Sequence, residues 1–132
     1  MMKKHNAFLL GLSAVATMSG AALAAKSAFS LQTLEKGQWS LRDKENGFKT
    51  VKRICLGDPQ VLIQLRHLGQ SCAVKRLNGD ARQAMYSYRC RGAQGSTTIR
   101  RETDRLVQIR SQGLDHGAPF AFDYEARKTG GC

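Results

Sequence analysis

Four cysteines are the residues of this sequence whose type and spacing point most directly to chemistry. They form an even set: Cys55, Cys72, Cys90 and Cys132. An even number of cysteines in a small exported domain is typical of a disulfide framework, whereas zinc sites use closely spaced ligands such as C-x-x-C. The sequence has no C-x-x-C motif, so we expect two disulfides, no metal site and no cofactor.

The N-terminal segment predicts the compartment in which those cysteines work. Lys3 and Lys4 precede a short apolar run, residues 7–18, and Ala22-Leu23-Ala24 supplies the small-x-small pattern of a cleavage site. We therefore interpret residues 1–25 as a signal peptide, cleaved after Ala24 or Ala25, that directs the chain to an oxidising space. The apolar run is shorter than the roughly 20 residues that span a bilayer, and we expect no membrane span after cleavage.

Four cysteines allow three disulfide pairings, and strand register helps to rank them. Cys72 and Cys90 flank one predicted hairpin whose midpoint is Ala81. If the strands pair symmetrically about that point, the two cysteines lie opposite each other, close to disulfide range. The same register places Val74 opposite Tyr88 and Leu77 opposite Met85.

That register has a competitor. It needs a seven-residue loop, 78–84, whereas a tighter turn at 78–80 would place Cys72 opposite Tyr86 and prevent the bridge. We favour the looser register, which pairs Cys72 with Cys90 and leaves Cys55 for Cys132. Cys55–Cys72 with Cys90–Cys132 remains the alternative.

Catalytic patterns are weak in this chain. After the signal, the histidines are His67, near a predicted helix end, and His116, beside Asp115 in a predicted loop. Neither has a nucleophile motif around it, no pair of carboxylates suggests general acid–base work, and no phosphate-binding glycine loop is present. We expect a non-catalytic protein. An envelope hydrolase or other enzyme with an unrecognised site is the alternative.

The basic residues give the better indication of function. The net charge of +11 falls to +9 when Lys3 and Lys4 leave with the signal. Such an excess attracts anions, and we expect a cationic surface that binds an anionic envelope polymer, a lipid phosphate or an acidic protein. Nucleic acid is not an expected partner, and a merely solvated sheet face is the plainer interpretation. The candidate anion-binding residues are Lys75, Arg89, Arg91, Arg100 and Arg101.

Alternating apolar and polar residues predict the elements that position these side chains. We expect strands at 38–42, 48–56, 72–75, 86–90, 96–101, 106–111 and 120–125, with loops at 92–95 and 113–119. Asp58 as N-cap, Pro59 at the first position and leucines at helical spacing predict one helix that ends at Gly69. The prediction is an α+β, mainly β, antiparallel meander of about six or seven strands with one short helix packed on it.

The mature chain fits a single domain. Removing 25 of the 132 residues leaves about 107, within the usual size of one domain. We expect residues 26–36 to form a partly loose lead-in and residues 37–132 to form one disulfide-bonded, β-rich domain.

Several short motifs match in order along the mature chain: Gly37-Gln38-Trp39, Cys55-Leu56 followed by Asp58 and a helix, Cys72, Tyr88-Arg89-Cys90-Arg91-Gly92, and Ala126-Arg127-Lys128-Thr129-Gly130-Gly131-Cys132. In this pattern the chain resembles the family of exported bacterial proteins called domain of unknown function 3617. It departs from the family at Lys36 and at Gly57-Asp58-Pro59. The resemblance implies a periplasmic, disulfide-bonded, β-rich domain and implies no reaction.

Overall fold

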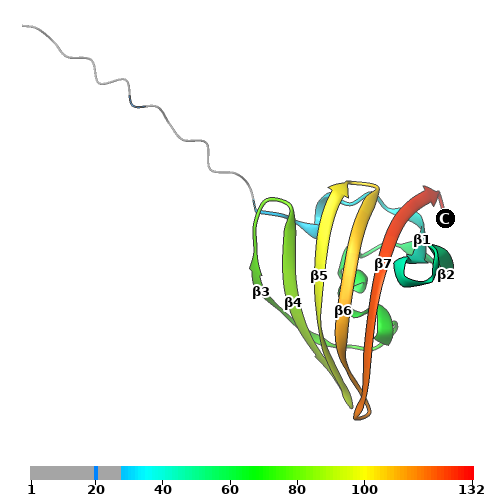
Figure 1. Cartoon of the computed structure of the whole chain (residues 1–132). Coiled ribbons are helices and arrows are strands. Elements are labelled where there is room, and N and C mark those ends of the chain that lie inside the picture. The colour runs from blue at the N-terminus through cyan, green and yellow to red at the C-terminus, as the bar shows by residue number, and fades with distance from the viewer. Residues whose placement is uncertain (1–19, 21–27) are drawn as a thin grey trace, which may run out of the picture.

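A seven-stranded antiparallel sheet forms the body of the protein (Figure 1). The computed structural model describes Gly20 and residues 28–132. Apart from Gly20, the predicted signal peptide lies outside the described residues. The elements are η1 (Leu31–Thr33), β1 (Gly37–Asp43), η2 (Lys44–Asn46), β2 (Lys49–Leu56), η3 (Pro59–His67), β3 (Ala73–Gly79), β4 (Gln83–Cys90), β5 (Ala93–Thr103), β6 (Leu106–Asp115) and β7 (Ala118–Gly130), where η denotes a 3₁₀ helix.

The strands lie in the order β2-β1-β7-β6-β5-β4-β3. Strands β3 to β7 form an uninterrupted meander, and the β1–β2 hairpin joins it because β1 pairs with the C-terminal part of β7, residues 124–130. Strands β2 and β3 are therefore the two edges of the sheet. The mainly β antiparallel class, with one helical segment packed on the sheet, is confirmed.

Two loops predicted from glycine positions are strand instead. β5 begins at Ala93, so only Arg91 and Gly92 separate it from β4. β6 continues to Asp115 and β7 begins at Ala118, which leaves a two-residue turn. In that turn His116 and Gly117 have φ of 50° and 83°. Left-handed residues at both central positions match the twist of paired strands, so a tight hairpin forms without a loop.

Both predicted disulfides are confirmed: Cys72–Cys90 and Cys55–Cys132. Val74 faces Tyr88 as predicted, but a bulge at Leu77 places Asn78, not Leu77, opposite Met85. The predicted seven-residue loop is also wrong. The Asp80 carboxylate accepts hydrogen bonds from the backbone N–H groups of Arg82 and Gln83, at 2.8 and 3.0 Å. These bonds close a short turn centred later than the tight turn at 78–80 would be, so a tight hairpin and the cysteine register coexist.

The hydrophobic core lies on the face of the sheet that η3 covers. Trp39, Ile99 and Ile109 are fully buried there, and η3 contributes Leu62 and Ile63. Burying such side chains removes large apolar areas from water, which is the main stabilising term in folding. The opposite face of the sheet points away from η3, and we call it the open face.

The lead-in differs from the prediction. From residue 28 onward it is packed rather than loose, with Phe29, Leu31 and Leu34 in the core cluster. Arg76 donates a hydrogen bond from Nη1 to the Phe29 carbonyl at 2.8 Å, which ties the segment to β3. The three apolar side chains follow no regular strand or α-helix period, so the sequence pattern did not indicate their burial.

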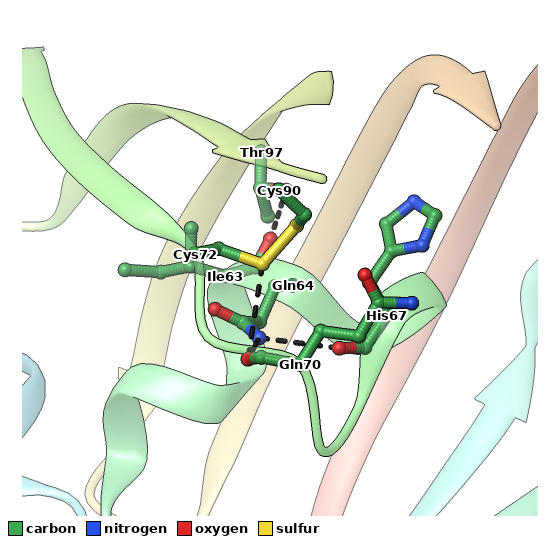
Figure 2. Close-up of a disulfide and its surroundings, with 7 residues drawn as sticks. All are labelled: Ile63, Gln64, His67, Gln70, Cys72, Cys90 and Thr97. Atoms are coloured by element: carbon green, nitrogen blue, oxygen red, sulfur yellow. Dashed lines mark hydrogen bonds between the residues drawn. A yellow bond between two sulfur atoms is a disulfide. The ribbon is translucent and has the colours of Figure 1, made fainter. Parts of the chain in front are cut away.

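The predicted helix forms as a kinked 3₁₀ segment. Asp58 caps it as predicted, since its carboxylate accepts from the N–H of Gln60 at 3.0 Å, and Gly69 turns the chain with φ of 82°. Gln64, however, has a non-helical backbone (φ −120°, ψ 42°). Its side-chain Nε2 donates to the carbonyls of His67 and Gln70, at 3.2 and 2.7 Å (Figure 2). The side chain thus holds the chain reversal between η3 and the Cys72–Cys90 disulfide.

Candidate functional site

Contacts with η3 establish which side chains point to the open face. The ring of His67, at the end of η3, lies 5.8 Å from the ring of Tyr88 on β4 and 5.7 Å from that of Phe120 on β7, centroid to centroid. Alternate residues of a strand point to opposite faces of a sheet. Arg89 and Ala121, the neighbours of Tyr88 and Phe120 in sequence, therefore project from the open face.

A groove of about 830 Å³ crosses the open face over β3 to β7. Its side chains come from two parallel rows of directly paired residues: Ala73-Arg89-Gln94-Leu114-Pro119 and Lys75-Ser87-Ser96-Gln112-Ala121. We call this feature the sheet groove. Its volume lies within the range of small-molecule sites, about 300–1,000 Å³.

Small residues leave the middle of the sheet groove unfilled. Ser87, Ser96 and Ala121 belong to the second row, and Gly95 pairs with Gly113 between the two rows. A Cβ atom on Gly95 would lie 2.7 Å from the Tyr88 hydroxyl oxygen, so the Tyr88 side chain uses the space that this glycine leaves on the helix-covered face. The groove floor is thus thin backbone lying over a buried tyrosine.

Two cations stand at one end of the sheet groove. Lys75 lies opposite Ser87, and Arg89 is two residues further along β4, so the two residues are diagonal neighbours with Cβ atoms roughly 7–8 Å apart. Neither forms an ion pair within residues 28–132, although nine other basic side chains do. In this part of the chain no Asp or Glu lines the groove. The positive potential there is not neutralised by the protein itself.

The structure does not bring the other three predicted anion-binding residues to this place. Arg91 lies in the turn after β4, outside the groove lining. Arg100 forms an ion pair with Glu102 at 2.8 Å. Arg101, the next residue of β5, points to the helix-covered face, where it bonds Asp104 at 3.1 Å and lies over the Phe29 ring. The expectation of one surface shared by all five cations fails at Arg101, because consecutive strand residues face opposite ways.

A second, smaller hollow of about 310 Å³ extends the groove toward the tip of the sheet. It shares Arg89, Gln94 and Leu114 with the sheet groove and continues to Gly92 and Gly117 in the two tip turns. The groove therefore continues into this hollow on the side of the tip turns, and Arg89 lies where the two hollows meet.

The two histidines lie apart from the groove floor. His67 is buried against Tyr88 and Phe120. His116 is exposed in the tip turn, and its Nδ1 lies 2.8 Å from Asp115 Oδ1. The hydrogen bond with His116 outweighs the effect of burial and holds the pKa of Asp115 below its ordinary value, and the nearby charges of His67, His116 and Arg66 lower it further. No serine, threonine or cysteine makes a hydrogen bond to either imidazole in the described part of the chain.

Sequence reasoning missed most of the groove. Gln94, Leu114 and Pro119 fall in segments predicted to be loops, so their strand parity was not considered. The signal that would have found them is the parity of the flanking strands, which extends without interruption through Gly95 and Gly113. Lys75 and Arg89 were identified because both lie in well-patterned strand.

Among the described residues, no cluster of three or more His, Cys, Asp or Glu side chains is arranged to hold a metal ion. Likewise, none of the helices in residues 28–132 is long and apolar enough to cross a bilayer. Comparisons with protein-family models, with curated proteins and with solved structures gave no match to this chain.

Proposed function

We propose that this protein is an exported, non-catalytic binding module that holds an anionic component of the cell envelope in the sheet groove. The observation that carries the proposal is the Lys75–Arg89 pair. These two cations are diagonal neighbours at one end of the hollow, and within residues 28–132 they form no ion pair and no Asp or Glu lines the hollow. Phosphate and carboxylate groups form strong charge-assisted hydrogen bonds with such donors, above all with the planar guanidinium of arginine.

The two disulfides support the location. They suggest an oxidising, extracytoplasmic environment, because thiols are kept reduced in the cytosol. Export through residues 1–25, cleavage after Ala24 or Ala25 and residence in the periplasm belong to the same proposal. The intact mass of the protein recovered from the envelope tests it, since a chain that begins at Met1 would contradict signal cleavage. Membership of the domain of unknown function 3617 family remains part of the proposal.

The residues that line the groove support binding rather than catalysis. Within the described residues its polar groups are amides, hydroxyls and two cations, and none is a carboxylate or imidazole that could act as a general base. The enzymatic alternative would have to use the exposed Asp115–His116 pair. Replacing His116 with alanine tests that alternative: a hydrolase would lose activity, whereas the groove would still bind its anion.

Inorganic phosphate is the first probe for the groove, and its binding is detected by changes in the amide chemical shifts of the purified protein. We expect phosphate to shift the amides of Lys75, Ser87, Arg89 and Gln94, and added salt to reduce the effect. The variant Lys75→Gln/Arg89→Gln should lose these shifts. Lys52→Gln/Arg53→Gln is the matched control, because it removes two exposed charges from β2 that form no ion pairs within residues 28–132. Shifts of equal size in both variants would overturn the proposed anion site.

A further inference from the structure

We infer that the sheet groove takes an amphipathic anion, with its acidic headgroup at Lys75 and Arg89 and a single alkyl chain lying across β5 to β6 and β7. This inference rests on the proposed function and adds the chemical class of the ligand. It commits to one occupant, a single-chain anionic lipid, and an anion whose alkyl chain adds no affinity is the outcome that would contradict it.

The lining of the groove changes character from one side to the other. β3 and β4 contribute the two cations, and β5 contributes neutral polar groups from Gln94 and Ser96. β6 and β7 contribute the apolar side chains of Leu114, Pro119 and Ala121, with Gln112 as the polar side chain among them. Leu114 keeps 40% of its surface exposed, so its side chain is accessible to a ligand in the groove. An apolar surface beside a cationic one suits an amphipathic ligand that has an anionic headgroup and an apolar chain.

The spacing of the strands gives the distance between the cationic and the apolar sides of the groove. Arg89 and Leu114 belong to the same cross-strand row, with Gln94 between them. Since neighbouring strands lie about 4.8 Å apart, Leu114 is roughly 10 Å from Arg89 along the row and Pro119 roughly 14 Å. An alkyl chain attached to a headgroup at Arg89 can therefore cover the apolar side of the groove. The tip hollow, which shares Arg89 and Leu114, gives a longer chain room to continue.

The same features argue against the two larger ligands. A polyanion would need cations repeated along its path, yet beyond Lys75 and Arg89 the groove presents only neutral residues in the described part of the chain. An acidic protein would leave the apolar lining of a narrow groove without a matching group unless it inserted one. Charge at one end and apolar surface at the other favour a small amphiphile.

Calorimetric titration of the purified, disulfide-intact protein with three probes tests the inference. They are octyl phosphate, inorganic phosphate and octyl glucoside, each kept below the concentration at which micelles form. We expect octyl phosphate to bind about 10- to 100-fold more tightly than inorganic phosphate, because the chain leaves water. Octyl glucoside, which lacks the charge, should bind at least about tenfold more weakly than octyl phosphate.

Matched variants separate the two halves of the site. Lys75→Gln/Arg89→Gln should lower the affinity for both octyl phosphate and inorganic phosphate. Leu114→Ser should lower the affinity for octyl phosphate alone, by about five- to tenfold. Leu77→Ser is the control for the latter, since Leu77 is 48% exposed on β3 but does not line the groove. Variants are compared only where their circular dichroism and unfolding midpoints match the parent protein.

The outcomes are distinct. If inorganic phosphate binds in an Arg89-dependent way but the octyl chain adds no affinity, the anion site stands and the amphiphile is wrong. If octyl phosphate and octyl glucoside bind with equal affinity, the proposed contact of an anionic headgroup with Lys75 and Arg89 is wrong. If no phosphate probe binds, both the proposed function and this inference fail.

Discussion

Thr97 on β5 and Ser111 on β6 lie directly opposite each other, and their hydroxyl oxygens are 2.8 Å apart beneath η3. Thr97 Oγ1 also donates to the Ile63 carbonyl at 2.6 Å (Figure 2). Because a hydroxyl carries only one proton, Ser111 must donate to Thr97. Two strands and the kinked 3₁₀ segment are thus joined by one fully buried chain of hydrogen bonds.

Replacing Thr97 with valine should lower the free energy of unfolding by about 2 kcal/mol, measured by urea denaturation. The substitution keeps the shape but leaves the Ile63 carbonyl and the Ser111 hydroxyl buried without partners, and such groups cost about 1–3 kcal/mol each. Thr98→Val is the matched control, because Thr98 points to the open face and should change stability by no more than about 0.5 kcal/mol. Equal effects of the two substitutions would contradict the structural role of the hydroxyl pair.

The two disulfides should contribute unequally to stability. In the chain-entropy model, the bond between Cys55 and Cys132, 77 residues apart, is worth about 4.5 kcal/mol, against about 3 kcal/mol for Cys72–Cys90, 18 residues apart. We expect Cys55→Ala/Cys132→Ala to unfold at lower urea concentration than Cys72→Ala/Cys90→Ala. If Cys72→Ala/Cys90→Ala instead unfolds at the lower urea concentration, the Cys72–Cys90 disulfide stabilises mainly the folded state, by fixing the connection between η3 and β3.

All three tyrosines of the chain should titrate late. Burial raises the pKa of Tyr86, Tyr88 and Tyr124 above the ordinary value of 10.0. The unfolded state therefore loses these protons first, so folding stability is intact below pH 10 and falls as pH rises above it. Tyrosinate absorbance should appear at higher pH in the folded protein than in concentrated urea. Coincident titration curves would show that the three rings are accessible to solvent.

Asp123 should govern part of the acid response. Burial alone would raise its pKa, but hydrogen bonds from Arg110 and Lys44, at 3.1 and 3.2 Å, outweigh that effect and hold the pKa below 3.8. Its contribution to stability is therefore complete above pH 3.8 and is lost as pH falls through the lower, folded-state pKa.

The substitution Asp123→Asn tests this acid response in urea denaturation across acid pH. The variant should be less stable than the parent at neutral pH, and the difference should shrink as the solution is acidified. Glu45→Gln removes an exposed carboxylate that forms no ion pair within residues 28–132 and serves as the control. A stability difference for Asp123→Asn that does not change with pH would rule out the proposed ionic role.

Most of the strands, the Cys72–Cys90 bond and the buried face of that hairpin could be predicted because they follow from local alternation, and Cys55–Cys132 followed as the remaining pair. Residue parity in Cys72, Val74, Tyr88 and Cys90 was enough to align the hairpin, although the bulge at Leu77 was not foreseen. A bulge depends on sheet twist and on where Asp80 closes the turn, and neither leaves a periodic signal. The burial of Phe29 and Leu34 was missed for a similar reason, since their partners are far away in sequence.

The groove shows most clearly where the sequence and the tertiary structure divide. That Lys75 and Arg89 share one face of a hairpin follows from their positions in the chain, because side-chain direction alternates along any strand. The surface around them follows from the packed fold. The tertiary structure extended β5, β6 and β7 through the glycine segments so that Gln94, Leu114 and Pro119 complete the surface. That extension depends on which strands become neighbours, and neighbour choice is a property of the whole packed sheet.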